Sequence, residues 1–186
     1  IKNILRFLIA KNNMEIPSMH ILNSGINSLF NSDDQSGEIK WSNHIIKRFN
    51  GRIYFLSMNS VMPYNSSDNI FWSINRRIDL KDPVGSIEAK FTNGEGISSK
   101  KCSENLSIKF RKEGEKIRLN GSHHSKTLKN FLNEKKVLPW ARDKIPLIYD
   151  NQELICVGDL WTNQNFIADS SECSFLIQWN TEMKIL

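Results

Sequence analysis

The sequence predicts an α+β protein in which a two-helix plus antiparallel meander domain is followed by a mostly β domain carrying one amphipathic helix. Two observations lead to this prediction. Apolar residues recur at intervals of three and four up to about residue 30, and at intervals of two from about residue 38. A polar segment around Pro63 then separates the two patterns from the rest of the chain, so we expect domains at residues 1–60 and 61–186.

The first domain is expected to begin with two helices. Apolar residues in the first ten positions have helical spacing from Ile1 onward, as in a helix already under way, so we expect the chain to be the carboxyl-terminal piece of a longer protein. Pro17 and Ser18 suit the start of the second helix, with Ser18 as its N-cap. Gly25 lies inside that helix, where core packing explains it better than a phosphate loop.

Three short strands are expected next. Asn50-Gly51 between two of them is a strong hairpin signal, because both residues tolerate positive φ. Residues 57–69 are expected to be the linker, and residues 93–99 a Gly-rich break in the second domain. The expected strands of the two domains are residues 39–41, 45–49, 53–56, 70–74, 78–80, 87–91, 106–111, 116–119, 147–149, 154–157 and 175–179.

One helix of the second domain is expected from about Ser125 to Lys136. A helical wheel places Lys126, Lys129 and Lys136 within one arc, opposite an apolar face. The helix would therefore present three ammonium groups in a row, at a spacing that suits successive phosphates. A solvated helix face explains the same residues.

Basic residues are concentrated in the second half of the chain. Residues 100–150 hold 13 Lys or Arg against 6 Asp or Glu, whereas the remaining residues hold 12 against 14. A polyanion such as nucleic acid is the natural partner for such a surplus. The same surplus spread over a folded surface would only aid solubility, so both interpretations stay open at this point.

Residues 121–125, Gly-Ser-His-His-Ser, precede the expected helix, whose first amide groups and dipole favour an anion. A capped helix start explains them equally well. His123 and His124 are adjacent and point apart, and no Cys or carboxylate cluster accompanies them, so no metal site is expected. Nucleotide-binding and nucleophile motifs are also missing, and we expect neither a catalytic residue nor a cofactor in this chain.

A further candidate segment is Leu138 to Leu147, in which two prolines fix the backbone around Trp140. We expect Trp140 to be buried and to anchor the turn after the helix. Arg142 and Lys144 are then the contact candidates of this segment. Three separated cysteines without a CxxC pair, and the lack of an apolar run of about 20 residues, favour a cytoplasmic protein without a membrane span.

Residues 106–161 resemble the carboxyl-terminal domain of bacterial tRNA(Ile)-lysidine synthetases. The resemblance rests on Lys116-Ile117-Arg118-Leu119, Gly121, His124-Ser125-Lys126, Pro139-Trp140, Arg142-Asp143, Ile145-Pro146-Leu147 and Leu160-Trp161. The first domain resembles the substrate-binding domain of the same family through Ile16-Pro17-Ser18, Asp33-Asp34 and the run from Arg48 to Tyr54. Leu138, Ser122 and Gly158-Asp159 depart from the family pattern.

The resemblance implies an ATP-dependent ligase. The family joins lysine to the wobble cytidine of tRNA(Ile) with a CAU anticodon, which changes decoding from AUG to AUA. ATP, with magnesium, and lysine would bind an amino-terminal domain that this chain lacks, so the chain is expected to recognise tRNA and to be inactive by itself. The resemblance leaves open whether the protein forms a homodimer. The expected RNA contacts are Arg48, Arg52, Arg111, Arg118, His124, Lys126, Lys129, Lys136, Arg142 and Lys144.

The alternative is a protein-interaction or self-association module. An exposed β edge with aromatic residues such as Trp161 and Trp179 would then pair with another subunit. A third hypothesis, an independent hydrolase, is disfavoured because no catalytic constellation is found in the sequence.

Overall fold

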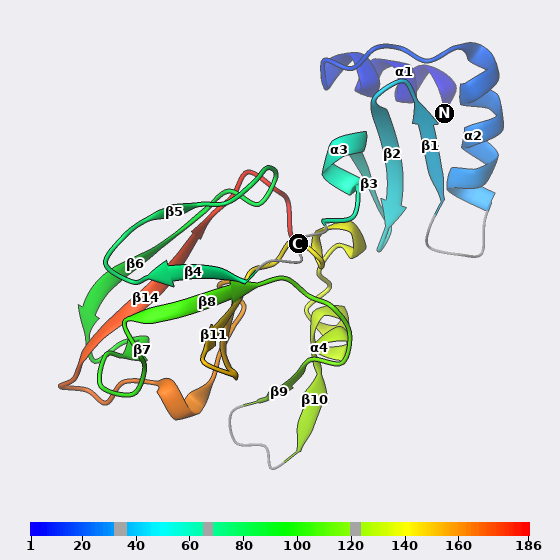
Figure 1. Cartoon of the computed structure of the whole chain (residues 1–186). Helices are drawn as coiled ribbons and strands as arrows, with labels where there is room; N and C mark the ends of the chain where they lie inside the picture. The colour runs from blue at the N-terminus through cyan, green and yellow to red at the C-terminus, as the bar shows by residue number, and fades with distance from the viewer. Residues whose placement is uncertain (32–36, 65–68, 120–123) are drawn as a thin grey trace. The chain divides into compact units, whose positions relative to one another are not determined.

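The computed structural model describes residues 1–31, 37–64, 69–119 and 124–186 and divides the chain into two compact units, Ile1–Met62 and Pro63–Leu186. The division falls two residues after the expected one. Both units combine helices with antiparallel strands (Figure 1), which confirms the predicted α+β class. No helix in the described part of the chain has the length and apolarity that a membrane crossing requires.

The first unit holds two helices, a three-stranded meander and a short third helix, so the predicted two-helix and meander arrangement is confirmed. Ser18 caps the second helix through its Oγ, which accepts from the Ile21 amide at 3.4 Å. Both turns of the meander have residues with positive φ, among them Asn50 and Gly51. The elements are α1 (Lys2–Lys11), α2 (Met19–Asn31), β1 (Glu38–Trp41), β2 (His44–Phe49), β3 (Arg52–Ser57) and α3 (Met58–Val61).

The core of the first unit forms where α2 packs on the meander. A Cβ at Gly25 would lie 2.7 Å from the side chain of Ile39, so the glycine lets helix and strand approach closely. This confirms core packing as the interpretation of Gly25. Trp41 closes the core and donates from its Nε1 to the Glu15 carbonyl at 2.7 Å.

The second unit contains two larger sheets, seen as two layers in Figure 1. One has the order β13-β12-β11-β8-β4, with β4 (Ile70–Ser73), β8 (Asn105–Lys109), β11 (Leu147–Asp150), β12 (Glu153–Val157) and β13 (Trp161–Thr162). The other has the order β5-β6-β14-β7, with β5 (Ile78–Asp79), β6 (Ser86–Asn93), β7 (Ile97–Ser98) and β14 (Cys173–Asn180).

Both sheets share one apolar core. Ile87 and Phe175 of the second sheet and Ile108, Ile148 and Ile155 of the first are completely buried in it. The core therefore joins strands that lie far apart in the sequence, and it fixes where the loops and the hairpin between the strands emerge.

Three short elements differ from the sequence-based expectation. Residues 58–61, expected in the linker, form α3 because Ser57 caps them through its Oγ. The Gly-rich break contains β7, and Trp161–Thr162 forms β13. Strands of two residues carry too little periodic pattern to be detected from sequence, and partner strands supply their hydrogen bonds.

Trp179 is also placed differently from the alternative hypothesis, which had it at an exposed edge. Its side chain is 8% exposed, and its Nε1 donates to the Val84 carbonyl at 2.8 Å. Trp179 pairs with the buried Ile87 of β6 and belongs to the apolar core, so it is excluded as a surface aromatic.

Candidate nucleic-acid interface

A small two-stranded sheet and the helix that follows it carry several of the predicted contact residues. The elements are β9 (Lys116–Arg118), β10 (Ser125–Thr127) and α4 (Leu128–Glu134), which we call the hairpin-helix segment. Figure 1 shows the β9–β10 hairpin running directly into α4. Lys116 pairs with Thr127 and Arg118 with Ser125, while Ile117 between them is buried. Lys116 and Arg118 therefore lie on the face of the hairpin opposite the core.

The helix begins later than predicted. Residues 125–127 pair with β9, and Thr127 is the N-cap, its Oγ1 accepting from the Asn130 amide at 3.3 Å. The Leu128 amide donates to the Glu115 carbonyl at 2.8 Å, a contact that only the folded hairpin provides. The expectation of an anion site at the helix start is thus wrong for Ser125, and residues 121–123 lie outside the described residues.

The helix also ends earlier than predicted. The Val137 amide donates to the Leu132 carbonyl and the Lys136 amide to the Asn133 carbonyl, while Lys136 has a φ of 57°. These are the bonds of a Schellman motif, which closes a helix with a residue in the left-handed region. Lys126 therefore lies on β10, Lys129 on α4 and Lys136 beyond it, so the predicted row of lysines on one helix is wrong.

The charges of this segment are only partly balanced. Lys126 donates to the Glu134 carboxylate at 2.5 Å. Among the described residues, no ion pair involves Lys116, Arg118 or Lys129, and all three side chains are exposed. Lys116 was not among the predicted contacts, although its alternation with Arg118 along a strand could have indicated it.

Arg111 and Arg142 lie close together although they are well separated in the sequence. Arg142 donates from Nε and Nη2 to the Val137 carbonyl at 2.9 and 2.8 Å, which fixes its guanidinium group. Burial and the neighbouring charge of Arg111 lower the pKa of Arg142. The Nε of Arg111 is buried without a hydrogen-bond partner among the described residues. Two neighbouring like charges, of which Arg142 is fixed by hydrogen bonds, favour an anion beside them.

Lys144, which was predicted to contact RNA, is buried. Its side chain is 1% exposed, and its ammonium donates to the Trp140 carbonyl at 2.8 Å and to the Asp143 carboxylate at 3.2 Å. An ammonium held in this way supports the turn from inside and does not reach an external phosphate. Trp140, expected to be buried, is only half-buried, so Lys144 is the residue that anchors this turn.

Three predicted contacts remain. Arg48 and Arg52 lie on β2 and β3 of the first unit, on either side of the Asn50-Gly51 turn. Arg48 donates to the Phe30 carbonyl at 3.3 Å, whereas Arg52 is exposed. His124 is exposed just before β10.

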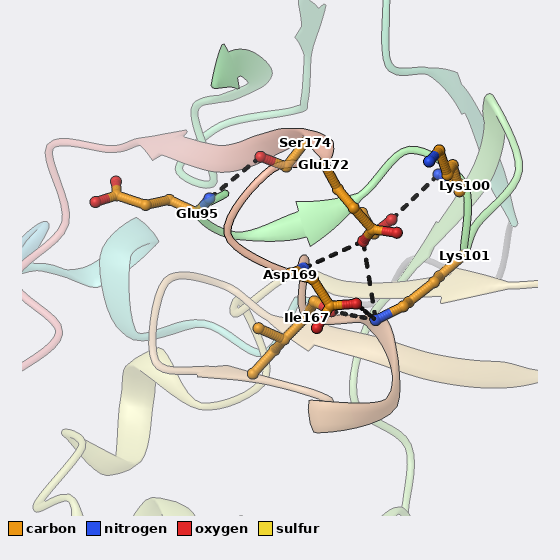
Figure 2. Close-up of polar contacts among 8 residues, drawn as sticks. Glu95, Lys100, Lys101, Ile167, Asp169, Glu172 and Ser174 are labelled. Atoms are coloured by element: carbon orange, nitrogen blue, oxygen red, sulfur yellow. Dashed lines mark hydrogen bonds and ion pairs between the residues drawn. The ribbon is translucent and has the colours of Figure 1, made fainter. Parts of the chain in front are cut away.

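Another lysine of the second unit, Lys101, is held by acidic partners. Figure 2 shows the Lys101 ammonium between the Ile167 carbonyl, Asp169 and Glu172, at 2.7, 3.4 and 3.9 Å. The Glu172 carboxylate also accepts from the Asp169 amide at 3.1 Å. We call Lys101, Asp169 and Glu172 the clasp, because they join the loop after β7 to the loop before β14.

The described residues contain no group of three or more His, Cys, Asp or Glu side chains able to hold a metal ion. The cysteines are free, and burial raises the pKa of Cys156 to about 12 and that of Cys102 to about 11, with Asp150 adding to the second shift. Thiols with such pKa values are poor nucleophiles. The exposed cations of the hairpin-helix segment, which have no acidic partners among the described residues, suit the class of polyanion-binding proteins.

Comparison with known proteins agrees with that class. Residues 106–179 match the family model of the TilS substrate C-terminal domain. The tRNA(Ile)-lysidine synthase of Coxiella burnetii is 27% identical over 98% of this chain, and that of Legionella pneumophila strain Paris is 30% identical over 84%. The chain spans 40% and 35% of the length of these two curated relatives.

A crystal structure of a TilS C-terminal domain is similar with a TM-score of 0.42 and 16% identity, covering 63% of this chain and all of that one. The family match and the relatives together place the chain in the tRNA(Ile)-lysidine synthase family, of which it is a carboxyl-terminal part.

Proposed function

We propose that this chain holds tRNA(Ile) for a tRNA(Ile)-lysidine synthase and performs no chemistry itself. The two relatives are tRNA(Ile)-lysidine synthases, and their sequences match 98% and 84% of this chain. The chain spans less than half of the length of either relative. The ligase reaction, which joins lysine to the wobble cytidine of the CAU anticodon with ATP and magnesium, belongs in this proposal to the rest of such a protein. The complete enzyme would act in the cytoplasm.

The observation that carries the proposal is the uncompensated charge of the hairpin-helix segment. Lys116 and Arg118 share one face of the hairpin, and Lys129 follows on the first turn of α4. Three exposed cations without acidic partners among the described residues can neutralise phosphates without first breaking an ion pair. Phosphate contacts of this kind position a folded RNA, and the shape of the RNA supplies discrimination.

The other proposed contacts differ in how readily their side chains can bind a phosphate. Arg111 and Arg142 form a preorganised pair, whereas Lys126 first has to leave Glu134. Lys144 is buried and is not one of the proposed contacts, whereas the exposed Lys116 is. The proposed RNA contacts are therefore Arg48, Arg52, Arg111, Lys116, Arg118, His124, Lys126, Lys129, Lys136 and Arg142.

The test is the salt dependence of tRNA binding. We expect a variant with Lys116→Gln, Arg118→Gln and Lys129→Gln to bind a tRNA(Ile) transcript more weakly. The slope of log affinity against log salt should fall by about 0.7 to 0.9 for each phosphate that is no longer neutralised. Fluorescence anisotropy at several salt concentrations measures both quantities.

The matched control is Lys100→Gln, which removes an exposed cation from the same unit next to the clasp. It should leave the slope unchanged. Equal slopes for the triple variant and the unaltered chain would remove the hairpin-helix segment from the proposal, and weak binding insensitive to salt would remove the tRNA function.

A second candidate function, self-association, is favoured by one observation. Phe71 on the edge strand β4 is 80% exposed, an unusual position for a large apolar side chain. If the chain associates through this edge, the mass measured by light scattering rises with concentration, and Phe71→Ser abolishes the rise. A constant monomer mass would exclude it.

A further inference from the structure

A pocket of about 460 Å³ is lined by residues of the β9–β10 hairpin and of β11, β12 and β13. The hairpin contributes Lys116, Arg118 and Ser125, and the sheet contributes Tyr149 and Trp161. Its size lies within the range of roughly 300 to 1,000 Å³ that is usual for small-molecule sites. The pocket thus joins the unbalanced cations described above to two aromatic side chains.

Trp161 has a hydrogen-bond donor that the described residues do not satisfy. Its Nε1 is buried and has no partner among them, although the residue as a whole is only partly buried. By contrast, Trp72 and Trp179 donate to the backbone carbonyls of Arg76 and Val84, at 2.6 and 2.8 Å. An indole N–H can only donate, so its missing partner has to be an acceptor.

The acidic residues of the pocket wall are engaged in local hydrogen bonds. The Glu115 carboxylate accepts from the Lys112 amide at 2.6 Å, and the Glu153 carboxylate accepts from the Asn163 side chain at 3.0 Å. Neither forms an ion pair with Lys116 among the residues that the structure describes. Carboxylates in the wall disfavour a bare anion, and suit a ligand that combines a phosphate with a polar ring able to donate hydrogen bonds.

Tyr149 supplies a partly buried aromatic surface. The Lys109 ammonium lies 4.5 Å from the centroid of its ring, and burial together with Glu115 raises the pKa of its hydroxyl. A neutral phenol that lines the pocket offers a ring to pack against and a hydroxyl that stays protonated. Proteins use such rings to hold bases that have left a stack.

We propose that this pocket takes one unpaired nucleotide of RNA. The base packs against Tyr149 and Trp161, one of its carbonyl or ring-nitrogen acceptors takes the hydrogen bond from Trp161 Nε1, and the adjacent phosphates lie at Lys116 and Arg118. The inference rests on the proposed function and adds to it, because a base pocket distinguishes single-stranded from paired positions, which phosphate contacts do not.

Nitrogen NMR of the indole groups tests the pocket directly. The chain is labelled with ¹⁵N-tryptophan, and Trp161→Phe identifies the Trp161 resonance. We expect a short single-stranded RNA to shift that resonance and to leave those of Trp72 and Trp179 unchanged. A blunt-ended RNA duplex should not shift it, and neither should inorganic phosphate.

Affinity measurements separate the hydrogen bond from the stacking. Trp161→Phe keeps a ring and removes the donor, and should weaken single-stranded RNA binding about fivefold. Trp161→Leu removes the stacking surface too and should weaken it by at least about tenfold more. The matched control, Phe91→Leu, removes an exposed ring of β6 outside the pocket and should leave this affinity unchanged. Circular dichroism verifies that each variant is folded.

The outcomes distinguish the two proposals. If duplex RNA and tRNA bind but the Trp161 resonance stays unshifted by single-stranded RNA, the pocket proposal is overturned and the tRNA function stands. If single-stranded RNA shifts the resonance while tRNA binding is weak and insensitive to salt, the pocket stands and the tRNA function falls. If no RNA binds at low salt, both are overturned.

Discussion

The clasp and the hairpin-helix segment belong to the same unit, but they differ in whether their cations have acidic partners. Lys101 of the clasp is held between Asp169, Glu172 and a backbone carbonyl. Lys116 and Arg118 of the hairpin have no acidic partner among the described residues. Sequence composition counts these cations alike, although only those of the hairpin remain available to a polyanion.

This difference shows that basic side chains stay available for binding only where the fold places no acidic side chains next to them. The clasp uses its cation to join two loops, and Lys144 uses its own to support a turn. The hairpin does not depend on its cations in this way, because strand pairing and Ile117 already hold it in place. In the proposed function, stability and RNA recognition therefore depend on different cations.

The largest expected effect is on stability, at Lys144. Lys144→Ala removes a buried ammonium and its hydrogen bonds to the Trp140 carbonyl and to Oδ1 of Asp143, whose Oδ2 keeps the Tyr64 amide, so the free energy of unfolding should fall by about 3 kcal/mol. The salt slope of tRNA binding should not change. Urea denaturation and anisotropy measure the two quantities.

Lys129→Ala is the matched control for Lys144, with the reverse pattern. It should leave the free energy of unfolding within about 0.5 kcal/mol of its original value and lower tRNA affinity. A Lys144 variant of normal stability with a lowered salt slope would show that the side chain leaves the interior to bind RNA.

The next effect is a gain of affinity at Glu134. Glu134→Gln removes the partner of Lys126 and frees its ammonium, so tRNA affinity should rise about twofold to fivefold, in line with the small free energy of an exposed ion pair. The salt slope should become steeper. Glu104→Gln, which removes an exposed carboxylate elsewhere in the unit, is the control. An equal rise for both variants would mean that only net charge matters.

The smallest expected effect is the pH dependence of the clasp. The Asp169 amide lowers the pKa of Glu172 below its ordinary value of 4.5, with smaller contributions from Ser98, Lys101 and Lys100. The folded state therefore binds this proton less readily than the unfolded chain, and the stabilisation is complete above pH 4.5. It disappears as the pH falls through the lowered value.

Glu172→Gln should consequently have a lower melting temperature than the unaltered chain at about pH 6, and the two should converge towards about pH 3. Its tRNA affinity at neutral pH should be unchanged. A melting difference that is the same at both pH values would show that Glu172 acts through the shape of its side chain and not through its charge.

Much of the fold was predictable from local pattern. Ser18 caps α2, Asn50-Gly51 forms its turn, and each longer strand lies where apolar alternation placed it, because these features depend on neighbouring residues. The start of α4 was not predictable, since it depends on the pairing of β10 with β9 and on a bond from Leu128 to Glu115. Helical periodicity across residues 125–136 therefore pointed to a longer helix.

The sequence by itself determined the α+β class, the order of the main elements, the basic surplus of the second half and the family. Only the tertiary structure decided which cations are engaged inside the fold. Lys126 meets Glu134, Lys144 turns inward, and Arg111 comes next to Arg142 because packing brings together side chains from separate segments. Local pattern sets the backbone, whereas the partner of a charged side chain is set by contacts between residues far apart in the chain.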